Sequence, residues 1–158
     1  MGLALLRIQK AEQVLKLCTT YFIPEAGRTW EMMQTEEARE RKKTLGHFLK
    51  KLREKVHVDP TFDDVLDRFL ADRNTFVHHI EDMPNFSLGT EAGLLVGIDF
   101  VRQLTDRAEH VTNVIAGFVN LFGDALGFNG STKDIDPANP DDFYKMIALM
   151  AFKLPKST

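Results

Sequence analysis

The sequence has a single cysteine, Cys18, and lacks any long uninterrupted run of apolar residues. One cysteine excludes an intrachain disulfide framework and a zinc site built from cysteine ligands. No apolar stretch approaches the ~20 residues that a helix needs to cross a bilayer. The amino terminus lacks the basic-then-apolar layout of a secretory signal, and Leu6 stands where a myristoylation site has Ser or Thr. We therefore predict a cytoplasmic protein with no membrane partner.

Helix-breaking residues are few, and the net charge is small. The 158 residues include six Pro and ten Gly, 44% of them are apolar, and the net charge is −3. This length and composition are typical of one globular domain and are too apolar for a disordered tail. We therefore treat residues 1–158 as one domain, in which a polar and basic segment at 28–43 and a loop at 123–139 serve as connections.

Strand patterns are also missing. No segment shows sustained alternation of polar and apolar residues, whereas apolar residues recur at three- and four-residue steps along most of the chain. Asp59-Pro60 and Thr90 are helix start signals. The sequence predicts an all-α bundle of four or five helices with one long helix, with helical segments at about 3–22, 44–54, 59–80 and 90–122, and a last one starting at 139.

The segment at 90–122 is the longest predicted helix, on the order of 50 Å. Its apolar residues follow helical spacing and predict one buried stripe: Leu94, Ile98, Val101, Leu104, Ala108, Val111, Ile115, Phe118 and Phe122. So long a helix packs along several neighbours or a second subunit. Gly93 and Gly97 lie four residues apart and predict the close approach of another helix.

Four aspartates surround the start of the last predicted helix: Asp134, Asp136, Asp141 and Asp142. No glycine-spaced calcium loop frames them, so we interpret them as solvated loop and capping carboxylates. The sequence therefore predicts no metal ion and no cofactor.

The segment at 59–80 contains an anomaly. At ~100° per residue, Arg73 lies in the middle of its apolar stripe, within about 20° of Leu66 and Ile80. A guanidinium among apolar side chains costs several kcal/mol unless it is paired or reaches water or an anion. We therefore expect Arg73 to meet a buried carboxylate, for example Glu91 or Asp99 of the long helix, or a neighbouring subunit, or a phosphate.

The run DRNTFVH at 72–78 resembles the signature of HEPN domains, in which an Arg followed by a polar residue precedes a His after four to six intervening positions. The resemblance implies an all-α bundle that forms a homodimer with two facing motifs. It also implies a metal-independent endoribonuclease of a toxin–antitoxin, phage-defence or RNA-processing system. HEPN toxins that pair with nucleotidyltransferase antitoxins usually carry Tyr two residues after the His, where this chain has Ile80.

The motif residues suit RNA cleavage. His78 can act as base or acid near neutral pH, and Arg73 can hold the scissile phosphate through two donors. Asn74 lies one turn from His78 and would orient it or bind the ribose. His79 points elsewhere, and we interpret it as a surface residue. The alternative is structural: Arg73 in an ion pair, and His78 as a favourable cation at the end of its helix.

Positive charge is concentrated in residues 39–55, which hold eight basic and two acidic residues. Four apolar residues keep one face of this segment buried, so the basic side chains are expected on the exposed face. The segment is either a solvated helix face or a phosphate-tracking surface for RNA formed by Lys42, Lys43, Lys50, Lys51, Arg53 and Lys55. Since charge is so uneven, the net −3 does not exclude RNA.

The sequence therefore favours a HEPN-like protein that cleaves or binds RNA, with Arg73, Asn74 and His78 as its site. The rival interpretation is a non-catalytic helical module for dimerisation or for binding a protein regulator, a partner or a nucleotide.

Overall fold

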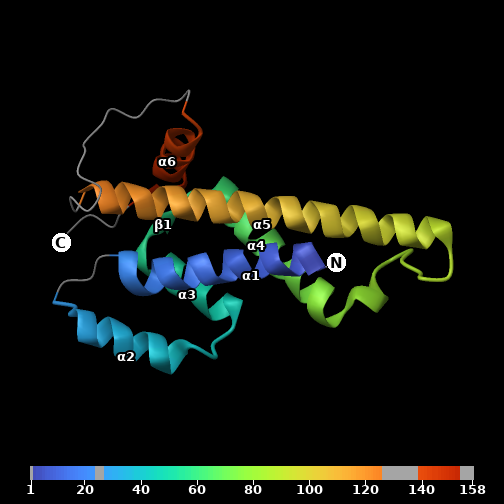
Figure 1. Ribbon diagram of the computed structural model, residues 1–158, viewed down its shortest axis with the longest axis horizontal. Helices are drawn as coiled ribbons and strands as arrows, with labels where there is room; N and C mark the ends of the chain where they lie inside the picture. Colours follow the sequence, from blue (N-terminus) through green and yellow to red (C-terminus); the bar gives the residue numbers. More distant parts are fainter. Residues whose placement is uncertain (1, 24–26, 126–138, 154–158) are drawn as a thin grey trace.

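A computed structural model describes residues 2–23, 27–125 and 139–153, and these form an all-α bundle, which confirms the predicted fold class (Figure 1). Helices α1 and α5 run side by side in the same direction, with α6 on one side of α5 and α2 at the opposite edge of the molecule. The α-helices of the described residues are α1 (Gly2–Leu17), α2 (Trp30–Glu40), α3 (Leu45–Lys55), α4 (Pro60–His78), α5 (Glu91–Ala125) and α6 (Pro140–Ala151).

Several boundaries differ from those expected. The segment 28–43, predicted as a connection, contains helix α2, whose start is capped by the Thr29 hydroxyl accepting from Met32 N at 3.3 Å. A π-helical turn, η1 (Cys18–Phe22), continues α1. Strands β1 (His57–Val58) and β2 (Phe152–Lys153) pair antiparallel and are too short to show an alternating pattern. The predicted loop at 123–139 begins within α5, and residues 126–138 lie outside the described ones.

The core lies where α1, α3, α4 and α5 meet. Helix α1 buries a stripe at four- and three-residue steps, formed by Ala4, Ile8, Ala11 and Leu15 and continued by Cys18. Leu3 and Leu6, which share the apolar spacing, are 65% and 64% exposed instead. Several apolar side chains at the start of α1 therefore face outward.

The stripe predicted on α5 is correct for its second half only. Leu104, Ala108, Val111, Ile115 and Phe118 are buried, but Leu94 and Ile98 are 41% and 61% exposed. The reason is that α1 and α5 are offset along their axes, since Arg7 near the start of α1 pairs with Glu109 in the middle of α5 at 2.7 Å. From that pairing and the rise per residue, α1 begins roughly 20 Å after α5 does, so the first turns of α5 have no α1 beside them.

Glycines mark two close approaches to α5. A Cβ at Gly93 would lie 2.5 Å from Ser87 N, and one at Gly97 would lie 2.6 Å from the Phe86 ring. The segment that approaches is thus the connection between α4 and α5, which contains a short 3₁₀ turn, η2 (Ile80–Asp82), and not the helix predicted there. At Gly117 the neighbour is a helix, because a Cβ there would lie 2.4 Å from the Tyr144 carbonyl oxygen of α6.

Within the described ranges, none of the helices combines the length and the apolar character that crossing a membrane requires.

Candidate functional site

Helix α4 carries the Arg73 motif from the core to the surface. Pro60 starts the helix, and the Asp59 carboxylate caps it by accepting from Thr61 N at 2.9 Å. Phe62, Leu66 and Phe69 are buried, but no residue of α4 after Phe69 is fully buried. The motif therefore occupies the half of α4 that leaves the core.

Arg73 has two partners. Its Nε donates to Glu12 Oε1 of α1 at 2.6 Å, and its Nη1 donates to Asn74 Oδ1 at 3.2 Å. The side chains of Arg73 and Glu12 are 24% and 17% exposed. The prediction of a carboxylate partner was right in kind and wrong in place, because Glu12 lies on α1 and not on the long helix. Asp99 instead accepts hydrogen bonds from residues of its own helix.

Asn74 and His78 are both exposed, on the outer side of α4. His78 is the last residue of the helix, and the backbone N–H of the following residue, His79, donates to Thr75 O at 2.8 Å. His79 is exposed, as predicted, and its Nδ1 lies 3.4 Å from Asp82. The described contacts include no hydrogen bond from His78 to Arg73 or Asn74, so the imidazole is accessible at the edge of the motif.

The residue before the motif arginine fixes α4 on its other side. Asp72 forms an ion pair with Arg107 of α5, in which Arg107 Nη1 donates a hydrogen bond to Asp72 Oδ2. Burial, together with the nearby Arg68, lowers the pKa of Arg107. Consecutive residues of α4 thus contact different helices, Asp72 reaching α5 and Arg73 reaching α1. Both bonds fix the rotation of α4 about its axis, and with it the direction in which Asn74 and His78 point.

The basic segment does not present all six predicted side chains. Lys42 and Lys43 are exposed in the turn between α2 and α3, and exposed Lys50 lies 3.9 Å from Glu54. Lys51 was expected on the surface but is buried, because α2 folds back over α3 and places Glu36 and Glu40 on its ammonium group.

Two other basic residues are also engaged. Arg53 Nε lies 2.7 Å from Asp63, and its Nη2 lies 2.6 Å from Asp67, both on α4. Burial alone would lower the pKa of Arg53, but the hydrogen bonds to these carboxylates outweigh it, and the pKa lies above its ordinary value. Lys55 is half-buried, and its Nζ donates to Thr19 O at 3.5 Å. The free positive charge is therefore smaller than the sequence suggests.

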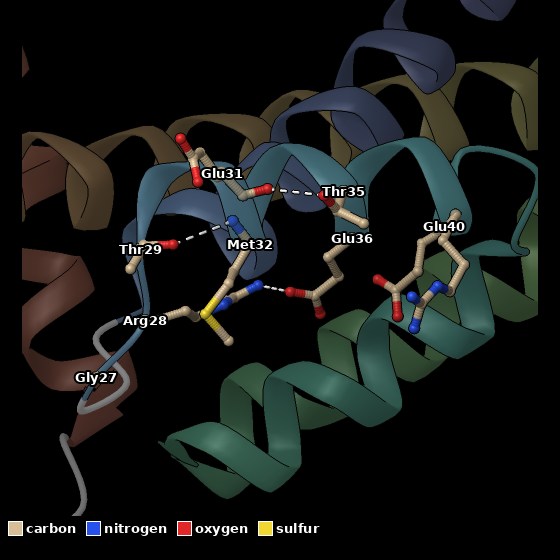
Figure 2. Close-up of a pocket in the computed structure, with 9 residues that line it drawn as sticks. Gly27, Arg28, Thr29, Glu31, Met32, Thr35, Glu36 and Glu40 are labelled. Atoms are coloured by element: carbon tan, nitrogen blue, oxygen red, sulfur yellow. Dashed lines mark hydrogen bonds and ion pairs between the residues drawn. The ribbon is translucent and has the colours of Figure 1, made fainter.

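A cavity of about 770 Å³ lies along α2, and its lining contains none of the three motif residues. Figure 2 shows Arg28, Glu36 and Glu40 pointing into it on the side that faces the neighbouring helix. Arg28 forms an ion pair with Glu36. Sequence patterns gave no signal for this acidic and basic network, because its members are polar residues of a segment with little to bury.

Among the described residues, no group of three or more His, Cys, Asp or Glu side chains is placed to hold a metal ion. Asp134 and Asp136 of the predicted acidic loop lie outside those residues. No family model, no curated protein and no solved structure matches this chain.

Proposed function

We propose that this chain is a cytoplasmic HEPN-like homodimer that cleaves RNA without a metal ion, in a toxin or defence type of system. Arg73, Asn74 and His78 would form the site. The observation that carries the proposal is the position of the Arg73 guanidinium, which reaches around α4 to Asn74 and so joins the accessible side that also carries His78.

The proposed chemistry needs one base and one acid. One His78 takes the proton of the ribose 2′-hydroxyl as its oxygen attacks phosphorus. The bond from phosphorus to the 5′-oxygen breaks, and that oxygen receives a proton from the His78 of the second copy. Arg73 neutralises charge on the phosphate during attack. The products are a 2′,3′-cyclic phosphate and a free 5′-hydroxyl.

Exposed apolar side chains support dimer formation. Val77, beside His78, is 44% exposed, and Leu95 and Ile98 at the free start of α5 are 59% and 61% exposed. In monomeric proteins, exposed apolar side chains that form one contiguous patch mark a partner surface. A second copy that covers the start of α5 would gain the burial of these residues.

The test is cleavage of RNA in the presence of EDTA, with solution mass measured by light scattering. We expect wild type to produce fragments ending in 2′,3′-cyclic phosphate and His78→Ala to lose about 100-fold or more in rate. His79→Ala is the matched control, since it removes the adjacent exposed imidazole, and should cleave like wild type. An intact wild-type dimer that leaves RNA uncut would refute the nuclease proposal.

The second candidate is a non-catalytic helical module for dimerisation or for binding a partner or a nucleotide. The Arg73–Glu12 ion pair favours it, because Glu12 already satisfies the guanidinium and ties α4 to α1. In that case Arg73→Ala would destabilise the fold, and His78→Ala would change neither stability nor any cleavage.

A further inference from the structure

Lys51 is a charged residue that is buried, at 8% exposure. Its ammonium group contacts only carboxylates of α2: Nζ donates to Glu40 Oε2 at 2.7 Å and also to Glu36. A buried ammonium is tolerated only when it is paired this way. The cover over Lys51 is therefore α2 itself, and removing α2 would place the lysine on the surface of α3.

Helix α2 buries little apolar surface. None of its residues is fully buried, Trp30 and Met32 are 60% and 56% exposed, and Met33 is partly buried. Trp30 packs on the Tyr21 ring at 5.2 Å between centroids. Tyr21 OH also donates to Glu37 at 2.7 Å.

The remaining contacts of α2 pair its carboxylates with cations. Glu40 Oε1 lies 3.2 Å from His47 Nε2, in addition to its contact with Lys51, and Glu36 also pairs with Arg28. Cavities of about 150 and 300 Å³ lie between residues of α2 and residues of α1, η1 and α3, so α2 packs incompletely against them. Contacts of this kind weaken as salt or a competing anion is added.

The carboxylates of α2 occupy the side of α3 where basic groups gather. His47, Lys50, Lys51 and Lys55 line the same cavity of about 300 Å³ as Glu36 and Glu40 of α2 and Glu54 of α3. In the free protein two carboxylates thus sit where two anionic groups would be held. The spacing of the four basic residues along one helix of 11 residues suits a chain of phosphates, which offers repeated negative charge.

We propose that the face of α3 formed by His47, Lys50, Lys51 and Lys55 binds the phosphate backbone of single-stranded RNA, and that α2 is a displaceable cover whose Glu36 and Glu40 occupy this face until RNA replaces them. The choice of RNA as the polyanion rests on the proposed function. The cover itself rests on the burial of Lys51 beneath a helix that has no fully buried residue of its own.

The experiment compares wild type with Glu36→Gln/Glu40→Gln, which keeps side-chain size and removes both charges. The control is Glu31→Gln/Glu91→Gln, which removes two exposed charges that do not line the cavity of Lys51 and changes net charge equally. A fluorescent 20-nucleotide oligouridine is titrated into each protein. We expect the cover variant to bind about tenfold more tightly than wild type and the control to bind within about twofold of wild type.

Hydrogen exchange of the wild type provides a second measurement that does not depend on any variant. On adding the same RNA, amides of α2 should lose protection while those of α1, α4 and α5 keep theirs. Equal affinity of the cover variant and the control, an α2 that stays protected with RNA bound, or no RNA binding by any of the proteins would each overturn the proposal. Cleavage by wild type while α2 stays protected would refute the displacement of α2 and would still support the proposed nuclease. Tighter RNA binding by the cover variant without any cleavage would support the displacement of α2 and refute the proposed nuclease.

Discussion

The ion pair between Arg73 and Glu12 should stabilise the fold by an amount that a double-mutant cycle can measure. The two side chains are 24% and 17% exposed and are joined by one hydrogen bond of 2.6 Å. Exposed ion pairs contribute roughly 0.2–1 kcal/mol, and hydrogen bonds to charged groups about 1.5–3 kcal/mol. Because solvent still reaches both groups, we expect a coupling free energy of about 1–2 kcal/mol.

The cycle uses Glu12→Gln, Arg73→Met and the double variant. Methionine keeps most of the apolar stem that Arg73 packs, so the loss reports mainly the charge. Urea unfolding followed by circular dichroism at 222 nm gives each free energy of unfolding. For a chain of this size each kcal/mol corresponds to about 2–4 °C in Tm. A coupling below about 0.3 kcal/mol would refute the reasoning that Glu12 is the structural partner of Arg73.

The same variants separate the two roles of Arg73. If Arg73 holds phosphate, Glu12→Gln keeps RNA cleavage, since the guanidinium remains and loses a competitor. Arg73→Met then loses cleavage at a temperature where it is still folded. If Arg73 is only structural, both variants lose stability and neither changes cleavage per folded molecule. Cleavage that follows stability across the whole set would contradict a catalytic role for Arg73.

Four further predictions concern close contacts and titrating groups. Gly117→Ala should destabilise the protein by about 1–3 kcal/mol, because its Cβ would lie 2.4 Å from the Tyr144 carbonyl oxygen. Gly46→Ala, whose Cβ would meet a side chain at an ordinary 3.7 Å, should instead gain roughly 0.5 kcal/mol from helix propensity in the same urea assay. Burial raises the pKa of Cys18 to about 12, so a thiol reagent at pH 8 should modify the native protein only at the rate of unfolding. Burial would raise the pKa of Glu40, but hydrogen bonds from the lysine and histidine of α3 outweigh it and lower the pKa below its ordinary 4.5. The stabilisation is therefore present above pH 4.5 and lost as pH falls below it, where amides of α2 should exchange before those of α5.

How much of the molecule the sequence could predict depends on what holds each part. Helices packed by apolar stripes were predicted within a few residues, as in α3 and α4, because burial imposes a period that the sequence records. Helix α2 lies in a segment that the sequence predicts as a connection, because ion pairs between segments leave no periodic pattern in the sequence. Leu94 and Ile98 were assigned to the core, because spacing shows which side of a helix is apolar and does not show where its neighbour ends.

The candidate site divides in the same way. The position of Arg73 on an apolar stripe predicted that its charge is compensated, by a carboxylate, a second subunit or a phosphate, since the cost of burying a charge is local information. That the carboxylate is Glu12, on a helix 61 residues away, depends on the packing of α1 against α4 and could not be read from spacing. Lys51 was predicted to be exposed for a related reason: periodicity along α3 placed it outside, and a second helix then covered it.

The order of charges along the chain leads to a last prediction. Three glutamates of α2 precede the basic segment at 39–55 and a fourth, Glu40, lies within it. The turn at Lys42–Thr44 folds α2 against α3, so the protein neutralises part of its own basic face. RNA that displaces α2 releases counterions from its phosphates, but the freed carboxylates take counterions up. The slope of log affinity against log salt should therefore be shallower for wild type than for Glu36→Gln/Glu40→Gln. Each single-strand phosphate contact contributes roughly −0.7 to the slope, so two carboxylates that take up counterions should reduce it by about 1. Titrations of oligouridine between 50 and 300 mM NaCl measure both slopes. Parallel slopes would mean that RNA binds without breaking the contacts of Glu36 and Glu40. The carboxylates of α2 would then neutralise the basic residues of α3 permanently, within a chain whose net charge is −3, and would not compete with RNA.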